Sequence, residues 1–260
     1  ANAALLAATG KKAMISAKIW MTQHVYPSCK PTTAKTYENF LHSRILPALG
    51  DLPLADLNAI TLTEFINALR GDTARTTAID PELRMRKSDR SAPVTPARLL
   101  SDRTVRHYYD CLRDMLNKAV QWDYLSVNPI NKVDPPKYRK KRVTYLDDRQ
   151  AVQLLRCLAS EKSLPMRCAV LLALLCGLRL SEVGGLYLND VDWIDCKITI
   201  HQGLNYVPGL GNYLDTPKSD AGYRDIFLPA GMMALLDQTR AYHDEAAAVL
   251  GDRWHGDGRI

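Results

Sequence analysis

Apolar residues recur at helical spacing through residues 11–70, and they do so again from Ser101 to Gln121. In the second segment, apolar positions three and four residues apart predict one buried face of a helix. These positions are Val105, Tyr108, Leu112, Leu116 and Ala119. Ser101 is suited to cap the start of this helix, and Asn128-Pro129 predicts a stop after it. The pattern predicts a tail over residues 1–10 and a helical domain over residues 11–130.

The second half of the chain mixes helical and strand-like patterns. The apolar run Ala169–Cys176 predicts a buried helix that ends at Gly177, and Ser181 is expected to cap the next helix. Two β-type runs, Lys197–Ile200 and Arg224–Leu228, are separated by a Gly-rich connection over residues 203–215. A capping box is also expected at residues 61–64 in the first half, and another helix over residues 229–250. Residues 143–260 are therefore expected to form an α+β domain with a small antiparallel element.

Positive charge is concentrated in one half of the chain. Residues 1–142 contain 23 Lys and Arg against 13 Asp and Glu, a net of +10, whereas residues 143–260 contain 11 against 15, a net of −4. Charged runs are often only solvated surface, but an excess confined to one half favours a polyanionic partner. Part of it lies in residues 72–98, where helical periodicity is lost. We expect this basic insert to be disordered without DNA and to touch DNA when bound.

A basic linker is predicted over residues 131–142, where two prolines stiffen the chain ahead of a dense cationic block. We expect it to lie along a phosphate backbone. The helix after Ser101 carries further arginines on a face away from the buried one. The predicted DNA-binding residues are Arg103, Arg106, Arg113, Lys132, Lys137, Arg139, Lys140, Lys141 and Arg142.

Several classes of protein are disfavoured. No apolar run is long enough to cross a membrane, and no basic residue precedes the apolar start that a signal peptide would need, so a cytoplasmic protein is expected. The six cysteines form no zinc-ligand spacing, so we predict no metal and interpret them as small buried hydrophobic residues. Residues 203–215 contain Gly209-Leu210-Gly211, but the glycine spacing of a nucleotide-binding loop is absent.

The motif Gly177–Glu182 and the later stretch Thr216–Ser219, followed by Arg224–Pro229, resemble the tyrosine recombinase (phage integrase) family. They correspond to that family's G-L-R-x-S-E and T-x-K-S…R-x-I-x-L-P patterns. Residues 32–129 also resemble the family's helical core-binding domain, through Pro47–Gly50 and Leu100–Val105. The resemblance covers roughly residues 12–260.

This resemblance implies a mainly α-helical core-binding domain followed by the first part of an α+β catalytic domain. It implies that Arg179 is a catalytic arginine, that Lys218 protonates the leaving 5′-oxygen, and that Glu182 supports the elbow that carries Arg179. In this family a tyrosine attacks DNA and forms a 3′-phosphotyrosyl intermediate, so no cofactor is expected. The implied partner is double-stranded DNA at a recombination site, with possible self-association on that DNA.

The family pattern is incomplete, because no histidine in this sequence is followed by arginine three residues later. We therefore expect residues 1–260 to lack the second arginine motif and the tyrosine nucleophile, and to be inactive alone. A non-catalytic relative that occupies recombination sites and a type IB topoisomerase-like enzyme remain alternatives. For Arg179 the alternative is a structural salt bridge to Glu182, and for Lys218 an exposed lysine in a turn.

Overall fold

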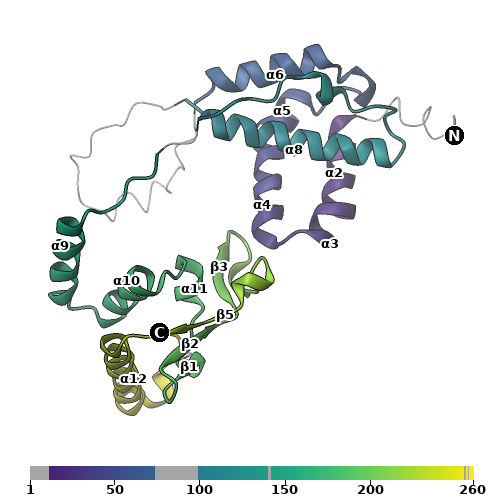
Figure 1. Cartoon of the computed structure of the whole chain (residues 1–260). Coiled ribbons are helices and arrows are strands. Elements are labelled where there is room, and N and C mark those ends of the chain that lie inside the picture. Colours follow the sequence, from purple (N-terminus) through teal and green to yellow (C-terminus); the bar gives the residue numbers. More distant parts are fainter. Residues whose placement is uncertain (1–11, 74–98, 140–141, 255, 257) are drawn as a thin grey trace, which may run out of the picture. The chain divides into compact units, whose positions relative to one another are not determined.

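The computed structural model describes residues 12–73, 99–139, 142–254, 256 and 258–260. The chain divides into two compact units, Ala1–Arg142 and Val143–Ile260, referred to below as the N-terminal and C-terminal units (Figure 1). The predicted tail over residues 1–10 lies outside the described residues. So does the basic insert over residues 72–98, apart from its first two residues.

The N-terminal unit consists of helices. Two of its helices contain a short π-helical stretch. The first runs from α2 (Ala13–Trp20) through the π-helical Met21–Val25 into α3 (Tyr26–Ser28). The second runs from α4 (Pro31–Phe40) through the π-helical Leu41–Ile45 into α5 (Leu46–Leu49). The other elements are α6 (Ala59–Gly71), α8 (Asp102–Gln121) and short 3₁₀ turns at Leu54–Asp56 and Pro129–Lys132.

The core of this unit is built around α8, which lies beside α6 and is crossed by α2 and α4 (Figure 1). Ser101 caps α8 as predicted, and all five positions predicted to form its buried face are buried. All of them except Ala119 pack in one cluster with side chains such as Trp20, Leu41 and Leu62. Since burying a leucine side chain stabilises a fold by about 1.5–3 kcal/mol, this face holds the unit together.

The start of α6 differs from the prediction. Asn58, not Thr61, is the N-cap, and its side-chain oxygen accepts the backbone N–H groups of Ile60 at 2.9 Å and Thr61 at 3.0 Å. The predicted capping box at residues 61–64 is therefore wrong. Asparagine caps helices as well as threonine does, and it comes first along the chain.

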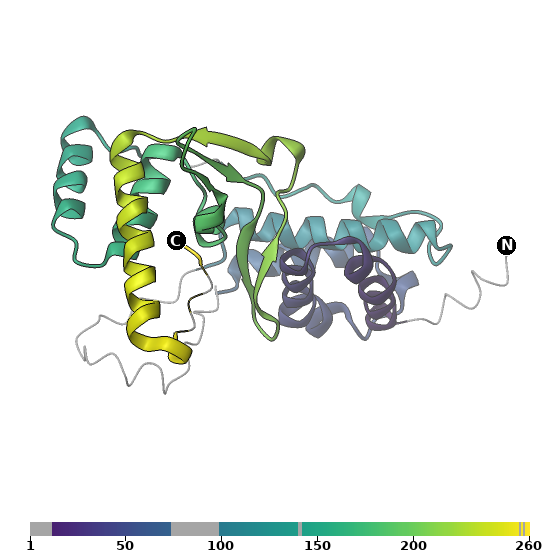
Figure 2. The same cartoon turned by 90° about the horizontal axis from the view of Figure 1, so that it is seen from below.

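The C-terminal unit has a small sheet with helices around it. The order is α9 (Asp148–Ala159), α10 (Leu164–Cys176), α11 (Leu180–Gly184), a 3₁₀ turn at Leu188–Asp190, β1 (Val191–Asp192), β2 (Lys197–Ile200), β3 (Gly203–Val207), β4 (Gly211–Asp215), a 3₁₀ turn at Asp220–Gly222, β5 (Arg224–Phe227), α12 (Ala230–Leu250) and a 3₁₀ turn at Gly251–Arg253. Strands β1, β2 and β5 form one antiparallel sheet in that spatial order. Helices α10 and α12 pack on each other, and Figure 2 shows the full length of α12.

Residues 203–215 were predicted to be a Gly-rich connection between two strands, but they have regular structure of their own. They form a separate antiparallel hairpin of β3 and β4, in which Val207 pairs with Gly211. Gly209 and Gly211 both have positive φ, so these glycines make the turn instead of loosening the segment. The hairpin packs against α11.

Helix α10 forms where a helix was predicted and follows α9, but much of the apolar surface of both helices is exposed. The capping box of Asp147 and Gln150 opens α9, yet within that helix only Leu158 is buried, and Leu155 keeps 40% of its surface exposed. The prediction of a buried helix over Ala169–Cys176 is wrong, since Leu175 is 52% exposed. The cysteines are free thiols, and Cys157 and Cys196 are exposed, which corrects the prediction that all six are buried.

Across the described residues, no helix is both long enough and apolar enough to cross a membrane.

Candidate functional site: a guanidinium–carboxylate cluster and a basic helix face

A tight elbow joins α10 to α11 and carries Arg179. Gly177 ends α10 in the left-handed conformation, at φ +66°, as predicted for a helix C-terminus. Arg179 itself is the N-cap of α11, so the prediction that Ser181 caps this helix is wrong. The Glu182 carboxylate accepts the Arg179 backbone N–H at 2.9 Å, the contact that a glutamate three residues after the N-cap makes in a capping box.

Glu182 is the centre of the elbow and is 8% exposed. Its Oε1 accepts from Arg179 Nη1 at 2.7 Å, and Arg224 of β5 donates to both carboxylate oxygens, at 3.1 Å and 2.8 Å. A two-pronged guanidinium–carboxylate pair of this kind fixes orientation as well as charge. The pair therefore joins α11 to β5 across 42 residues of sequence.

These contacts control the ionisation of the carboxylate. The hydrogen bonds from Arg224, followed by those from the backbone and side chain of Arg179, lower the pKa of Glu182 to about 2 against an opposing effect of burial. The same pair raises the pKa of Arg224. Glu182 is thus negative at any physiological pH, and the three side chains together carry one net positive charge.

The Arg179 side chain is 73% exposed. Most of the guanidinium is therefore open to solvent, and burial does not by itself demand an anionic ligand for it. The salt bridge to Glu182 that the alternative interpretation required does exist. It engages one Nη of the guanidinium, while most of the side chain faces solvent.

Lys218 lies in an irregular segment between β4 and β5 and is exposed. Among the described residues, its ammonium group makes no hydrogen bond or ion pair with Arg179, Glu182 or any other side chain. The segment is nevertheless held in place, because a side chain on Gly222 would overlap the ring of Pro217, next to Lys218. Arg224 Nη1 in turn donates to the Gly222 carbonyl at 3.3 Å.

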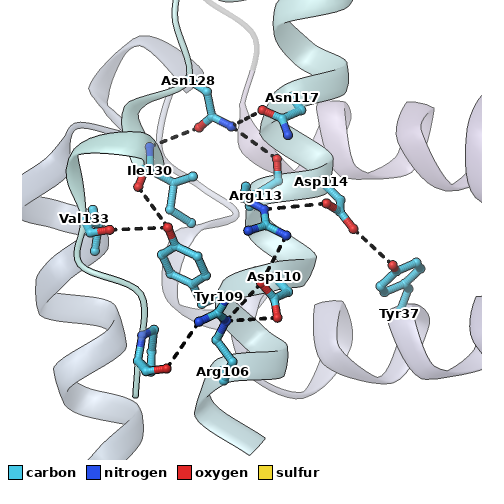
Figure 3. A network of polar contacts seen from close by, with 11 residues as sticks. Tyr37, Arg106, Tyr109, Asp110, Arg113, Asp114, Asn117, Asn128, Ile130 and Val133 are labelled. Atoms are coloured by element: carbon cyan, nitrogen blue, oxygen red, sulfur yellow. Dashed lines mark hydrogen bonds and ion pairs between the residues drawn. The ribbon is translucent and has the colours of Figure 1, made fainter. Parts of the chain in front are cut away.

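The second candidate surface lies on α8 in the N-terminal unit. Asp110 accepts from Arg106 Nε at 3.1 Å with both of its oxygens, and it pairs with Arg113 Nη2 at 3.3 Å (Figure 3). Both guanidinium groups also lie over the ring of Tyr109, at 5.5 Å and 6.0 Å from its centroid. Two of the predicted DNA-binding arginines are therefore already paired within the protein, whereas Arg103 is exposed.

The basic linker is tied to this helix. The Tyr109 hydroxyl donates to the carbonyls of Ile130 and Val133, at 3.4 Å and 3.3 Å, and Arg106 Nη1 donates to the Pro136 carbonyl at 3.5 Å (Figure 3). Later linker residues thus meet earlier residues of α8, so the linker runs antiparallel to the helix, toward the end that carries Arg103. The linker cations among the described residues are exposed: Lys132, Lys137, Arg139 and Arg142. Lys140 and Lys141 lie outside the described residues.

Two residues of these sites were missed at the level of sequence. Arg224 had been noted only as the first residue of a family pattern, and nothing in the local sequence connects it with Glu182. Asp110, by contrast, lies four residues after Arg106 and three before Arg113, a spacing that predicts helical ion pairs.

Comparison with known proteins places this geometry in a family context. Residues 16–70 match the family described as phage integrase, N-terminal SAM-like domain. The transposase from transposon Tn916 of Enterococcus faecalis is 30% identical over 132 residues, which cover 47% of this chain and 31% of that protein. The transposase from transposon Tn1545 of Streptococcus pneumoniae matches equally well. The matched stretch is thus about a third of the length of these curated relatives.

Solved integrase structures have the same fold. The Tn1549 transposon integrase, in complex with transposon right-end DNA, gives a TM-score of 0.67 at 20% identity over 89% of this chain and 65% of that one. A lambda integrase tetramer bound to a Holliday junction gives 0.60 at 14% identity over 96% of this chain and 60% of that one. The chain has the tyrosine recombinase fold. The family resemblance and the predicted fold class, mainly helical with small antiparallel sheets, are confirmed.

Proposed function

We propose that this chain binds duplex DNA and serves site-specific DNA recombination, a breaking and rejoining of strands through a 3′-phosphotyrosyl intermediate. The observation that carries the proposal is the cluster at Glu182, which fixes the base of Arg179 while leaving most of its guanidinium open to a ligand. A planar, permanently charged group presented in this way suits the nonbridging oxygens of a phosphodiester. The Tn1549 and lambda integrases, which share the fold, were solved bound to DNA.

Within this chemistry, Arg179 would neutralise charge on the phosphate as the phosphorus is attacked. Lys218 would give a proton to the departing 5′-oxygen, a role suited to an amine whose pKa falls readily when it loses water. A tyrosine nucleophile and a second arginine complete the reaction in this family. The sequence has no His-x-x-Arg motif, so we expect residues 1–260 to bind DNA without cleaving it.

The N-terminal unit would supply most of the affinity. In this proposal the exposed linker cations and Arg103 follow a phosphate backbone, Arg106 holds the linker, and Arg106 and Arg113 both contribute charge. The insert over residues 72–98 would add further contacts. The protein would act in the cytoplasm, on DNA, and would associate with other copies when bound at a recombination site. The chemistry requires neither metal nor nucleotide.

The second candidate function is occupation of recombination sites without catalysis. The internal pairing of Arg179 with Glu182 favours it. The two functions share the DNA interface and differ in the gene's reading frame beyond Ile260, where a recombinase would encode the missing motif and a late tyrosine.

The test uses residues 1–260 and a pool of nicked duplex oligonucleotides whose central sequence is randomised, so that any covalent product is trapped. A salt-sensitive gel shift without a denaturant-resistant band is expected, because the nucleophile is needed for a covalent adduct. A resistant band that disappears in a single Tyr→Phe variant would show that an internal tyrosine attacks DNA. Absence of any shift at low salt would contradict DNA binding itself.

A further inference from the structure

We propose that Arg224 is a positioning residue for the phosphate site, and that it sets the charge as well as the geometry of Arg179. This inference rests on the proposed function, in which Arg179 meets a DNA phosphate. Arg224 is not among the residues assigned a role by the sequence motifs. Its side chain is 29% exposed and points its guanidinium into the elbow, not toward solvent.

Arg224 fixes the geometry of the elbow that carries Arg179. Arg224 holds both oxygens of Glu182, so the carboxylate cannot turn, and Arg179 can reach it only with one Nη and its backbone N–H. The backbone N–H and one Nη of Arg179 are thereby held by Glu182, and its other guanidinium N–H donors face solvent. Arg224 also donates to the carbonyl of Gly222, which packs on Pro217 beside Lys218. One side chain therefore links the segments that carry both candidate catalytic residues.

Arg224 also changes the net charge next to Arg179. An isolated Arg179–Glu182 pair would be neutral, and a carboxylate 2.7 Å from the guanidinium would repel an incoming phosphate. With Arg224 present the cluster has a net charge of +1. Arg224 therefore raises the affinity of Arg179 for an anion that Arg224 itself does not touch.

Few other groups act on Glu182. Its own helix contributes Arg179, and β5 contributes Arg224. Strand β3, which packs on α11, contains no Asp, Glu, Lys, Arg or His, and Nδ1 of His201, just before this strand, lies 3.6 Å from Asp190 Oδ1. The charged residue of α10, Arg167, donates to Gln238.

The test measures binding of sulfate, which keeps its charge between pH 4 and 8, to the whole chain at constant ionic strength. The readout is the side-chain ¹⁵N–¹H NMR signal of Arg179 Nε, assigned by its loss in Arg179→Ala. At pH 7 the Arg179 Nε signal of the wild type should shift on addition of sulfate, whereas Arg179→Ala should show only the loss of that signal. Arg224→Gln should bind about tenfold more weakly, the effect of removing one charge close to the ligand. Arg224→Lys, which keeps the charge but not the fork, should lie between them.

Two further readouts separate positioning from a merely structural role. The double variant Glu182→Gln with Arg224→Gln should recover most of the lost affinity, because no carboxylate then opposes the anion. In Arg224→Gln the pKa of Glu182 should rise toward its ordinary value, so the deficit relative to wild type should shrink as the pH falls from 7 to 4. Taking the ratio of the two affinities at each pH removes the effects that both proteins share.

The outcomes are distinguishable. If the wild type shows no sulfate shift at Arg179, the proposed phosphate role of Arg179 fails. If wild type and Arg179→Ala behave as expected but Arg224→Gln binds like wild type, the role of Arg224 is overturned while the proposed function stands. If Arg224→Gln binds weakly, with neither rescue by Glu182→Gln nor recovery at low pH, Arg224 is structural only and the inference is likewise overturned.

Discussion

The two units bury amphipathic helices to very different degrees. In the N-terminal unit the apolar face of α8 is covered by the helices around it, and Leu112 has no exposed surface. In the C-terminal unit α9 has an equally clear apolar face, but Leu155 and Val152 stay 40% and 47% exposed. An amphipathic pattern predicts that a helix forms and which face is apolar. It does not say whether the partner for that face lies within the same stretch of chain.

The largest difference in stability between the two units is expected when leucines are truncated to alanine. Leu112→Ala should destabilise the N-terminal unit by about 2–5 kcal/mol, since it removes buried methyl groups and leaves a cavity. Leu155→Ala in α9 should change the stability of the C-terminal unit by less than about 0.5 kcal/mol. Denaturant unfolding followed by amide exchange in each unit measures both, with Leu158→Ala as the buried control within α9. Equal losses for Leu112→Ala and Leu155→Ala would mean that the apolar face of α9 is covered in solution.

The ion cluster at Glu182 should make the C-terminal unit sensitive to acid. Because the folded-state pKa is lowered from 4.5 to about 2, the stabilisation is complete above pH 4.5 and is lost as the pH falls toward 2. The shift corresponds to about 3 kcal/mol at most, and the stability difference between wild type and Glu182→Gln should shrink over that range. The pH dependence of unfolding in both proteins measures it. Parallel curves between pH 5 and pH 2 would contradict the cluster.

A smaller effect is expected at the junction of α4 and α8 in the N-terminal unit. The Tyr37 hydroxyl donates to Asp114 Oδ2 at 3.2 Å, and burial together with this carboxylate raises the pKa of Tyr37 to about 12. Tyr37→Phe should cost about 0.5–1.5 kcal/mol, the contribution of one hydrogen bond. Spectrophotometric titration should show one late-ionising tyrosine that disappears in the variant. If the late-ionising component is also present in Tyr37→Phe, the contact between Tyr37 and Asp114 is contradicted.

The smallest expected effect is on binding. Asp110→Asn removes the charge that neutralises Arg106 and Arg113, so affinity for duplex DNA should rise a few-fold and the salt dependence should steepen by up to about one unit. Fluorescence anisotropy at several salt concentrations measures both quantities. Asp102→Asn, on the same helix but without an ion pair to these arginines, is the matched control. A lower affinity for Asp110→Asn than for the control would indicate that the pairing orders the interface.

The sequence predicts local features of both units better than it predicts how those features are packed. The face of α8, the cap at Ser101 and the turn at Gly177 depend on local spacing and were predicted correctly. The wrong predictions of burial concern what surrounds an element: the apolar surface of α10 and the side chains of Cys157 and Cys196. These depend on contacts between distant segments, which periodicity does not encode.

The candidate site divides in the same way. The motif around Arg179 and Glu182 was recognisable, and the structure brings those two residues together. Arg224 joins them through a contact between residues 42 positions apart, for which the sequence holds no signal. Lys218 was located in a segment between strands, but its relation to Arg179 remains a prediction.

We expect the N-terminal unit to supply most of the DNA affinity and the C-terminal unit to add only a few positioned phosphate contacts. The most direct test is the slope of log affinity against log salt for the chain on duplex DNA. Replacing Arg139, Lys140, Lys141 and Arg142 by alanine should flatten this slope by about three to four units, whereas Arg179→Ala with Lys218→Ala should flatten it by about two at most. An unchanged slope in the linker variant, or a larger change in the Arg179 and Lys218 variant, would contradict the claim.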